Sequence, residues 1–138
     1  MDNKNLITAM PSNDDRFDPV VLIRDFNKQC KDAISRYNGN NECIAIRDQD
    51  TQDILHEIEL SEGKSASEGY KLYRKLKIVR EDRRRAKAEN EILEPFVQWL
   101  QQNQRTCEQL AQIQGRCSTK QQVIAKRKYT PRGNILDK

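Results

Sequence analysis

The feature that most constrains this chain is a run of seam residues spaced alternately four and three positions apart. It extends from Leu72 to Leu100 without a slip, and only Arg83 and Asn90 interrupt its apolar character. A sustained spacing of 3.5 residues is typical of helices that pack along one narrow face, as in coiled coils. The spacing predicts one long helix whose seam consists of Leu72, Leu76, Val79, Arg83, Ala86, Asn90, Leu93, Val97 and Leu100.

Pro95 lies inside this segment, and a helix interior disfavours proline. Proline has no backbone N–H and its ring clashes with the preceding turn, so it either kinks a helix or ends it. The spacing keeps its phase from Leu93 to Val97. We therefore expect Pro95 to kink the long helix, and the start of a separate helix at Pro95 is the alternative.

Three other segments have helical spacing. A first helix is predicted to begin at Asp18-Pro19, where the aspartate can cap it, and to end at Asn38-Gly39. A second is predicted over residues 42–60 and a fourth over residues 105–126. The expected organisation is a flexible arm at residues 1–15, a helical coiled-coil domain at 16–126 and a basic flexible tail at 127–138.

The composition fits an elongated helical protein better than a globular domain. Hydrophobic residues make up 36% of the chain and charged residues 33%, which leaves little apolar surface for a spherical core. A helical hairpin needs only a narrow apolar face, and five glycines with four prolines disfavour a turn-rich β fold. The predicted fold is all-α, an elongated antiparallel helical hairpin or bundle with a coiled-coil seam.

The lengths of the predicted helices bear on the oligomeric state. The second helix can cover only about half of the long third helix. The first helix, the fourth helix or a second copy of the chain must therefore bury the rest of the seam. A compact monomer and a homodimer both meet this requirement, and we favour the dimer.

The sequence contains no recognisable catalytic or metal-binding motif. His56 is the single histidine and lacks an assignable nucleophile nearby, so capping or packing is favoured over catalysis. The cysteines form no C-x-x-C pair, and we interpret them as small buried side chains. We expect no enzymatic activity, no cofactor and no metal. The cysteines are Cys30, Cys43, Cys107 and Cys117.

The sequence also bears on location. Its longest apolar runs are far shorter than the ~20 residues of a membrane span, and its first residues do not have the charged-then-apolar order of a signal peptide. We therefore expect a cytoplasmic protein that does not engage a membrane.

Charge is distributed unevenly along the chain. Residues 1–60 carry 7 Lys+Arg against 12 Asp+Glu, a net charge of −5, and the remainder carries 18 against 9, a net charge of +9. One interpretation of the basic run between Lys71 and Lys87 is a solvated face, neutralised by an i,i+4 ladder and by acids of the second helix. The ladder consists of Lys77, Glu81, Arg85 and Glu89.

The cations that this ladder leaves over are candidates for binding nucleic acid or an acidic protein, together with the basic tail. Tyrosine in such a surface can stack on bases. The candidate residues are Lys71, Arg74, Arg80, Arg84, Lys126, Arg127, Lys128, Tyr129 and Arg132.

Arg83, Asn90 and Trp99 form a second group of candidates. Buried polar residues in a seam commonly fix register or oligomeric state, and the alternative is a polar pocket for a ligand or partner. Arg83 is expected to pair with Asp48 or Thr51 across the hairpin. Trp99 is expected to pack against the fourth helix, or alternatively to anchor a partner.

The segments at residues 53–60, 68–73, 75–89 and 93–95 resemble small, mostly uncharacterised helical-hairpin proteins of phages and prophages of Gram-positive bacteria. The likeness covers about residues 44–100 and rests on patterns of charge and seam, so no functional residue is carried over. It implies a phage accessory protein, and many such proteins bind and inhibit host defence or replication machinery.

The leading expectation is therefore a non-enzymatic phage protein that binds a bacterial host protein in the host cytoplasm. Its specific form is an inhibitor of host anti-phage defence. The alternative is a nucleic-acid-binding accessory protein that uses the basic helix face and the C-terminal tail.

Overall fold

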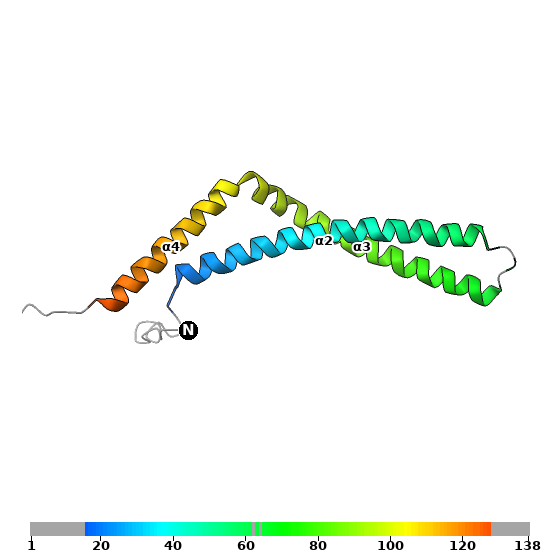
Figure 1. Cartoon of the computed structure of the whole chain (residues 1–138), viewed down its shortest axis with the longest axis horizontal. Coiled ribbons are helices and arrows are strands. Elements are labelled where there is room, and N and C mark those ends of the chain that lie inside the picture. The colour runs from blue at the N-terminus through cyan, green and yellow to red at the C-terminus, as the bar shows by residue number, and fades with distance from the viewer. Residues whose placement is uncertain (1–15, 62, 64, 128–138) are drawn as a thin grey trace, which may run out of the picture. The chain divides into compact units, whose positions relative to one another are not determined.

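The structure, a computed structural model, describes residues 16–61, 63 and 65–127. It contains the helices α2 (Pro19–Glu59), α3 (Ala66–Gln102) and α4 (Gln104–Lys126), and the described residues include no strand (Figure 1). The prediction of an all-α fold is confirmed. The predicted arm at residues 1–15 and the tail beyond residue 127 lie outside the described residues.

The chain divides into two compact units. One consists of residues 28–104, which include most of α2 and all of α3. The described part of the other consists of residues 16–27 and 105–127.

α2 is a single helix of 41 residues, whereas the sequence pattern predicted two helices separated at Asn38-Gly39. That prediction is wrong because Gly39 does not adopt the left-handed conformation of a helix C-cap; among the described glycines only Gly63 has a positive φ. The seam keeps its phase across the expected break, since Asn40 follows Tyr37 by three residues and precedes Ile44 by four. The buried face of the first predicted helix therefore continues directly into that of the second.

Local capping sets the starts of α2 and α3. The backbone N–H of Val20 donates to Asp18 Oδ1 at 2.9 Å, and Pro19 occupies the first helical position, as the sequence predicts. The backbone N–H of Glu68 donates to Ser65 Oγ at 3.3 Å at the start of α3. Between the two helices, Gly63 takes a φ of 80°, a region that favours glycine.

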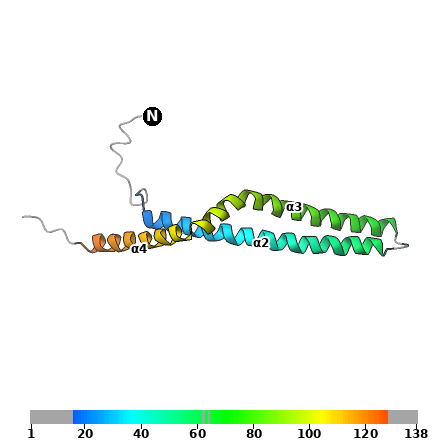
Figure 2. The same cartoon turned by 90° about the horizontal axis from the view of Figure 1, so that it is seen from above.

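Within residues 28–104, α2 and α3 lie side by side and antiparallel (Figures 1 and 2). Every seam position of α3 is buried or half-buried, and Val97 and Leu100 are only 2% and 4% exposed. On α2, Thr51 and Ile54 are likewise buried. A coiled-coil seam remains a prediction drawn from the spacing.

α3 continues through Pro95 as one helix. Proline cannot donate to the Glu91 carbonyl one turn earlier, so one helical hydrogen bond is missing there. Figure 2 shows a change of direction in the second half of α3. The expectation that Pro95 does not end the helix is confirmed.

The sequence argument for a dimer assumed that the helix opposite α3 covers only about half of it. This assumption is wrong, because α2 has 41 residues and α3 has 37. Asn90, in the second half of α3, donates to the backbone carbonyl of Tyr37, which the sequence pattern had assigned to a separate first helix. A homodimer therefore stays a prediction without this support.

The smaller unit pairs the start of α2 with the end of α4. Gln121 Nε2 donates to Asp18 Oδ1 at 2.7 Å, and this hydrogen bond is the main reason that the pKa of Asp18 lies below its usual value. α4 contains no buried residue; Cys107, Leu110 and Cys117 are half-buried. Its bounds agree with the predicted fourth helix to within one residue.

Candidate binding surfaces on the two flanks of α3

Asn90 is the polar centre of the hairpin and is 7% exposed. Its amide donates to the Tyr37 carbonyl at 3.1 Å and to Asn41 Oδ1 at 2.9 Å, while its own Oδ1 accepts from Asn40 Nδ2 at 2.9 Å. Both N–H groups and the carbonyl oxygen are therefore satisfied within the chain. This arrangement suits a residue that fixes register, and it leaves no free polar group for a ligand.

The register set by Asn40 and Asn90 brings Arg47 and Arg83 to one level of the seam, each seven residues closer to the connecting loop. Two guanidinium groups at one level repel each other unless acids separate them. Arg83 Nε donates to Asp48 Oδ1 at 2.6 Å, so Asp48 is the partner among the two that the sequence left open. Arg47 instead reaches Asp82.

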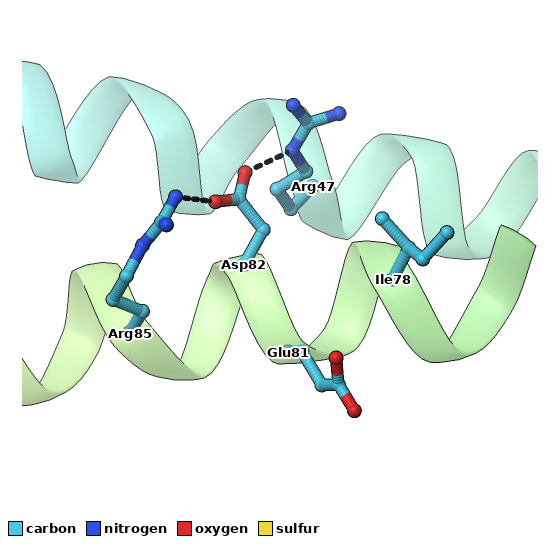
Figure 3. A pocket seen from close by; sticks show the side chains of 5 residues that line it. All are labelled: Arg47, Ile78, Glu81, Asp82 and Arg85. Carbon is cyan, nitrogen blue, oxygen red and sulfur yellow. Dashed lines mark hydrogen bonds and ion pairs between the residues drawn. The ribbon is translucent and has the colours of Figure 1, made fainter.

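Asp82 joins α3 to α2 beside a cavity of about 480 Å³ (Figure 3). Arg47 Nε donates to Asp82 Oδ2 at 2.7 Å, and Arg85 pairs with the other carboxylate oxygen. Figure 3 shows Asp82 between the two guanidinium groups, while Glu81 points away from them. The hydrogen bond from Arg47 is the main cause that lowers the pKa of Asp82, and the charge of Arg85 adds to it.

Arg47, Asp82 and Arg85 of this cavity are thus bound to one another. Arg47 also donates to Asp50 Oδ2 at 2.7 Å, and the thiol of Cys43 lies 3.6 Å from Asp82 Oδ2. The interactions with Asp82 and Asp50 raise the pKa of Arg47, with Asp82 the main cause. The cluster is an ion-pair network that ties the helices together, and its cations already have acidic partners.

Glu89, seven residues beyond Asp82, makes an equivalent connection. Arg36 binds both of its carboxylate oxygens, with Nη2 3.1 Å from Oε2, and Asn40 Nδ2 donates to Oε1 at 2.9 Å. Arg36 is the main cause that lowers the pKa of Glu89 to about 2, and Asn40 adds to it. We call the side of α3 that carries Asp82 and Glu89 the paired flank.

The predicted i,i+4 ladder along α3 forms only in part. Lys77 Nζ lies 4.0 Å from Glu81 Oε1, in a pair of exposed side chains that contributes little stability. Arg85 pairs with Asp82 and Glu89 pairs with Arg36, so the other two members are bound elsewhere. The ladder prediction is wrong for these two residues, because Glu89 binds Arg36 of α2 and Arg85 binds Asp82 of α3 instead.

The opposite flank of α3 carries a different set of residues, which we call the basic stripe. Its members are three or four positions apart, so they share one helix face, and Asp82 lies two positions from both Arg80 and Arg84, on another face. The stripe spans 17 residue steps, or about 26 Å. It consists of Tyr70, Tyr73, Lys77, Arg80, Arg84 and Lys87.

The cations of the basic stripe are far less committed than those of the paired flank. Within the described part of the chain, Arg80, Arg84 and Lys87 make no hydrogen bond or ion pair, and all three are exposed. A groove of about 270 Å³ runs along the stripe. It is lined by Tyr73, Leu76, Lys77, Arg80, Glu81 and Arg84.

The structure separates the basic residues that the sequence grouped together. Arg80 and Arg84 line one groove. The guanidinium of Arg74 lies over the Tyr70 ring, 6.0 Å from its centroid. Lys71 precedes Ile78 by seven residues, so it lies outside the basic stripe.

The tail candidates are only partly described. Lys126 ends α4, and Arg127 follows it; both are exposed and belong to the smaller unit. Lys128, Tyr129 and Arg132 lie outside the described residues. Arg80 and Arg84 belong to the other unit.

Sequence reasoning missed Tyr73, Lys77 and Lys87 as members of one surface. Lys77 was assigned to the i,i+4 ladder, which hid its common spacing with Arg80 and Arg84. The signal was present in the sequence, because these residues repeat at steps of three and four just as the seam does.

Trp99 lies beside Phe96, with ring centroids 6.5 Å apart and planes at 16°. It remains 42% exposed. Ile78, Arg85 and Ile92 precede it at intervals of seven residues, so the four form one line on the paired flank. Ile78 and Ile92 are 60% and 79% exposed, which makes this line the more apolar outer surface of α3.

The remaining functional signals are few. Among the described residues, no group of three His, Cys, Asp or Glu side chains could hold a metal ion. The described helices include none with a stretch long and apolar enough to cross a bilayer. Comparison of the chain with protein-family models, with curated proteins and with solved structures found no match.

Proposed function

We propose that this protein is a non-enzymatic binding protein that holds a nucleic acid along the basic stripe of α3. The observation that carries the proposal is the difference between the two flanks. Arg36, Arg47 and Arg85 are bound to acids, whereas Arg80, Arg84 and Lys87 have no such partner among the described residues.

The chemistry of the stripe fits phosphate better than a protein surface. Guanidinium groups bind phosphate oxygens in a bidentate manner, and regularly spaced cations suit a regularly charged polymer. Apart from its two tyrosines and the half-buried Leu76, the stripe and its groove are charged. Protein interfaces usually have an apolar centre depleted of lysine, which this face lacks.

Salt-dependent binding tests this proposal. A fluorescently labelled oligonucleotide is titrated with the protein at several salt concentrations, and anisotropy gives the dissociation constant. If four cations of the protein neutralise phosphates of a single strand, the release of the strand's counterions gives a slope of about −3 in log affinity against log salt. The double variant Arg80→Glu/Arg84→Glu should abolish binding at all salt concentrations.

The matched control is Lys28→Glu/Lys31→Glu, which reverses the charge of two exposed lysines of α2. It changes the net charge of the protein by the same amount as Arg80→Glu/Arg84→Glu. This variant should keep most of the affinity if the stripe is the site. Equal loss in both double variants, or no binding at low salt, would exclude a nucleic-acid site on the stripe.

A second candidate is the host-protein inhibitor that the phage resemblance implies. The exposed line of Ile78, Ile92 and Trp99 supports it, because tryptophan is enriched among interface hot spots and the two isoleucines add exposed apolar surface beside it. If it acts in this way, the protein should raise phage survival on a defended host, and Ile92→Glu should remove that effect while Arg80→Glu/Arg84→Glu keeps it.

A further inference from the structure

We infer that the basic stripe accepts a single strand, with a base stacked on Tyr73 and the phosphates following Lys77, Arg80, Arg84 and Lys87. This inference rests on the proposed nucleic-acid binding and adds the strand form and the stacking residue. Its starting point is that one exposed aromatic ring lines the same groove as three of these cations.

The geometry of the stripe favours a single strand over a duplex. The four cations lie along one side of a helix that is packed on α2, so the line that they form is fixed by the fold. The four cations span ten residue steps, or about 15 Å. A B-form backbone winds around its axis once in about 34 Å, so it turns through nearly half a turn over this length and leaves the line of the cations. A single strand has no such fixed winding and can follow the line.

Tyr73 is suited to stacking because its ring is available. It is 60% exposed and lines the groove beside Lys77 and Arg80. Base–aromatic stacking is the usual partner of phosphate binding in proteins that hold single strands. A duplex covers the faces of its bases, so it cannot use this ring without being opened.

Tyr70 provides a matched comparison within the same stripe. It is equally exposed at 60%, but the guanidinium of Arg74 lies over its ring at 6.0 Å. One face of Tyr70 is therefore occupied, and Tyr70 is absent from the lining of the groove. The structure thus assigns stacking to Tyr73 and not to Tyr70.

The test compares an oligothymidine of about 16 nucleotides, near the upper site size for such proteins, with a duplex of equal length. Anisotropy at low salt is measured for the full chain and for Tyr73→Ala, Tyr70→Ala and Tyr73→Trp. We expect the single strand to bind more tightly. Tyr73→Ala should weaken its binding about fivefold or more and leave duplex binding unchanged, because one stacking contact is lost.

Tyr70→Ala should have a smaller effect, and Tyr73→Trp should retain the single-strand affinity. Circular dichroism should show the same helix content for all variants. Equal losses for the two alanine variants, or a duplex that binds as tightly as the single strand, would overturn the inference. In that case loss of both forms in Arg80→Glu/Arg84→Glu would still support the proposed function.

Two further outcomes would also overturn the inference. If neither form binds at low salt, the proposed function and the inference both fail. If poly-glutamate binds as tightly as the oligonucleotide, and Tyr73→Ala changes neither affinity, the stripe is a general site for acidic polymers and the inference is wrong.

Discussion

The side-chain amide of Asn40 donates a hydrogen bond of 2.9 Å to Asn90 Oδ1 and so joins the middle of α2 to the middle of α3. The two residues are 50 positions apart in the sequence. Around them, Asn41, Tyr37 and Glu89 complete a network in which each buried polar side-chain atom has a partner within the described residues. Any shift of one helix along the other would break the network, since each position would then meet a different level of the seam.

Asn90→Ala should therefore destabilise the hairpin by about 1–3 kcal/mol, because the Tyr37 carbonyl and two asparagine side chains lose a partner in a partly buried site. Urea unfolding followed by circular dichroism measures the change. Asn38→Ala, at an exposed position of α2, should change stability by less than about 0.5 kcal/mol. Similar midpoints for the two variants would contradict the role of Asn90.

Gly39 offers a direct test of the continuous α2. Gly39→Ala should stabilise the protein by about 0.5–1 kcal/mol, because Gly39 is helical and an added Cβ meets no atom within 4 Å. Gly63→Ala should instead destabilise it, because Gly63 has a φ of 80°. If Gly39 were the left-handed cap of a shorter helix, both substitutions would be destabilising, and thermal unfolding distinguishes the two cases.

The stability of the hairpin should fall in acid through Glu89. Its pKa is about 2 in the folded chain against an ordinary value of 4.5, so the folded state favours the ionised carboxylate. This contribution is fully present above about pH 5 and is lost as the pH falls through 2, because Glu89 is protonated in both states only below that pH. The pKa of Asp82 is also lowered, so its contribution is lost in the same direction.

Melting temperatures between pH 7 and pH 2 should therefore fall less steeply in Glu89→Gln than in the unaltered chain. Glu108→Gln, which removes an exposed carboxylate of α4, serves as the control and should leave the slope unchanged. Parallel pH profiles for all three proteins would show that the Arg36–Glu89 pair does not stabilise the fold.

Glu81 is the one acid that lines the groove of the basic stripe. Glu81→Gln removes a negative charge beside the proposed phosphate path and frees Lys77 from its exposed pair. Its affinity for an oligonucleotide should rise severalfold at low salt, and the gain should shrink as screening increases. An unchanged or weaker affinity, measured by anisotropy beside Glu108→Gln, would argue against phosphates in this groove.

The periodicity of the sequence determined the all-α class, the length of α3 through Pro95, the bounds of α4 and the buried face of the hairpin. These properties could be predicted because a helix places residues three and four apart on one side, whatever lies opposite. The spacing also contained the basic stripe, although assigning Lys77 to the i,i+4 ladder obscured its common spacing with Arg80 and Arg84.

Only the tertiary structure decided where α2 ends and which cations remain available. Asn38-Gly39 has the local chemistry of a helix end, but Asn40 finds partners in Glu89 and Asn90, which a helix ending there would lose. Arg36 and Arg47 likewise bind acids 53 and 35 positions away. Such partners are set by the antiparallel register, so local spacing alone cannot distinguish the paired flank of α3 from its basic stripe.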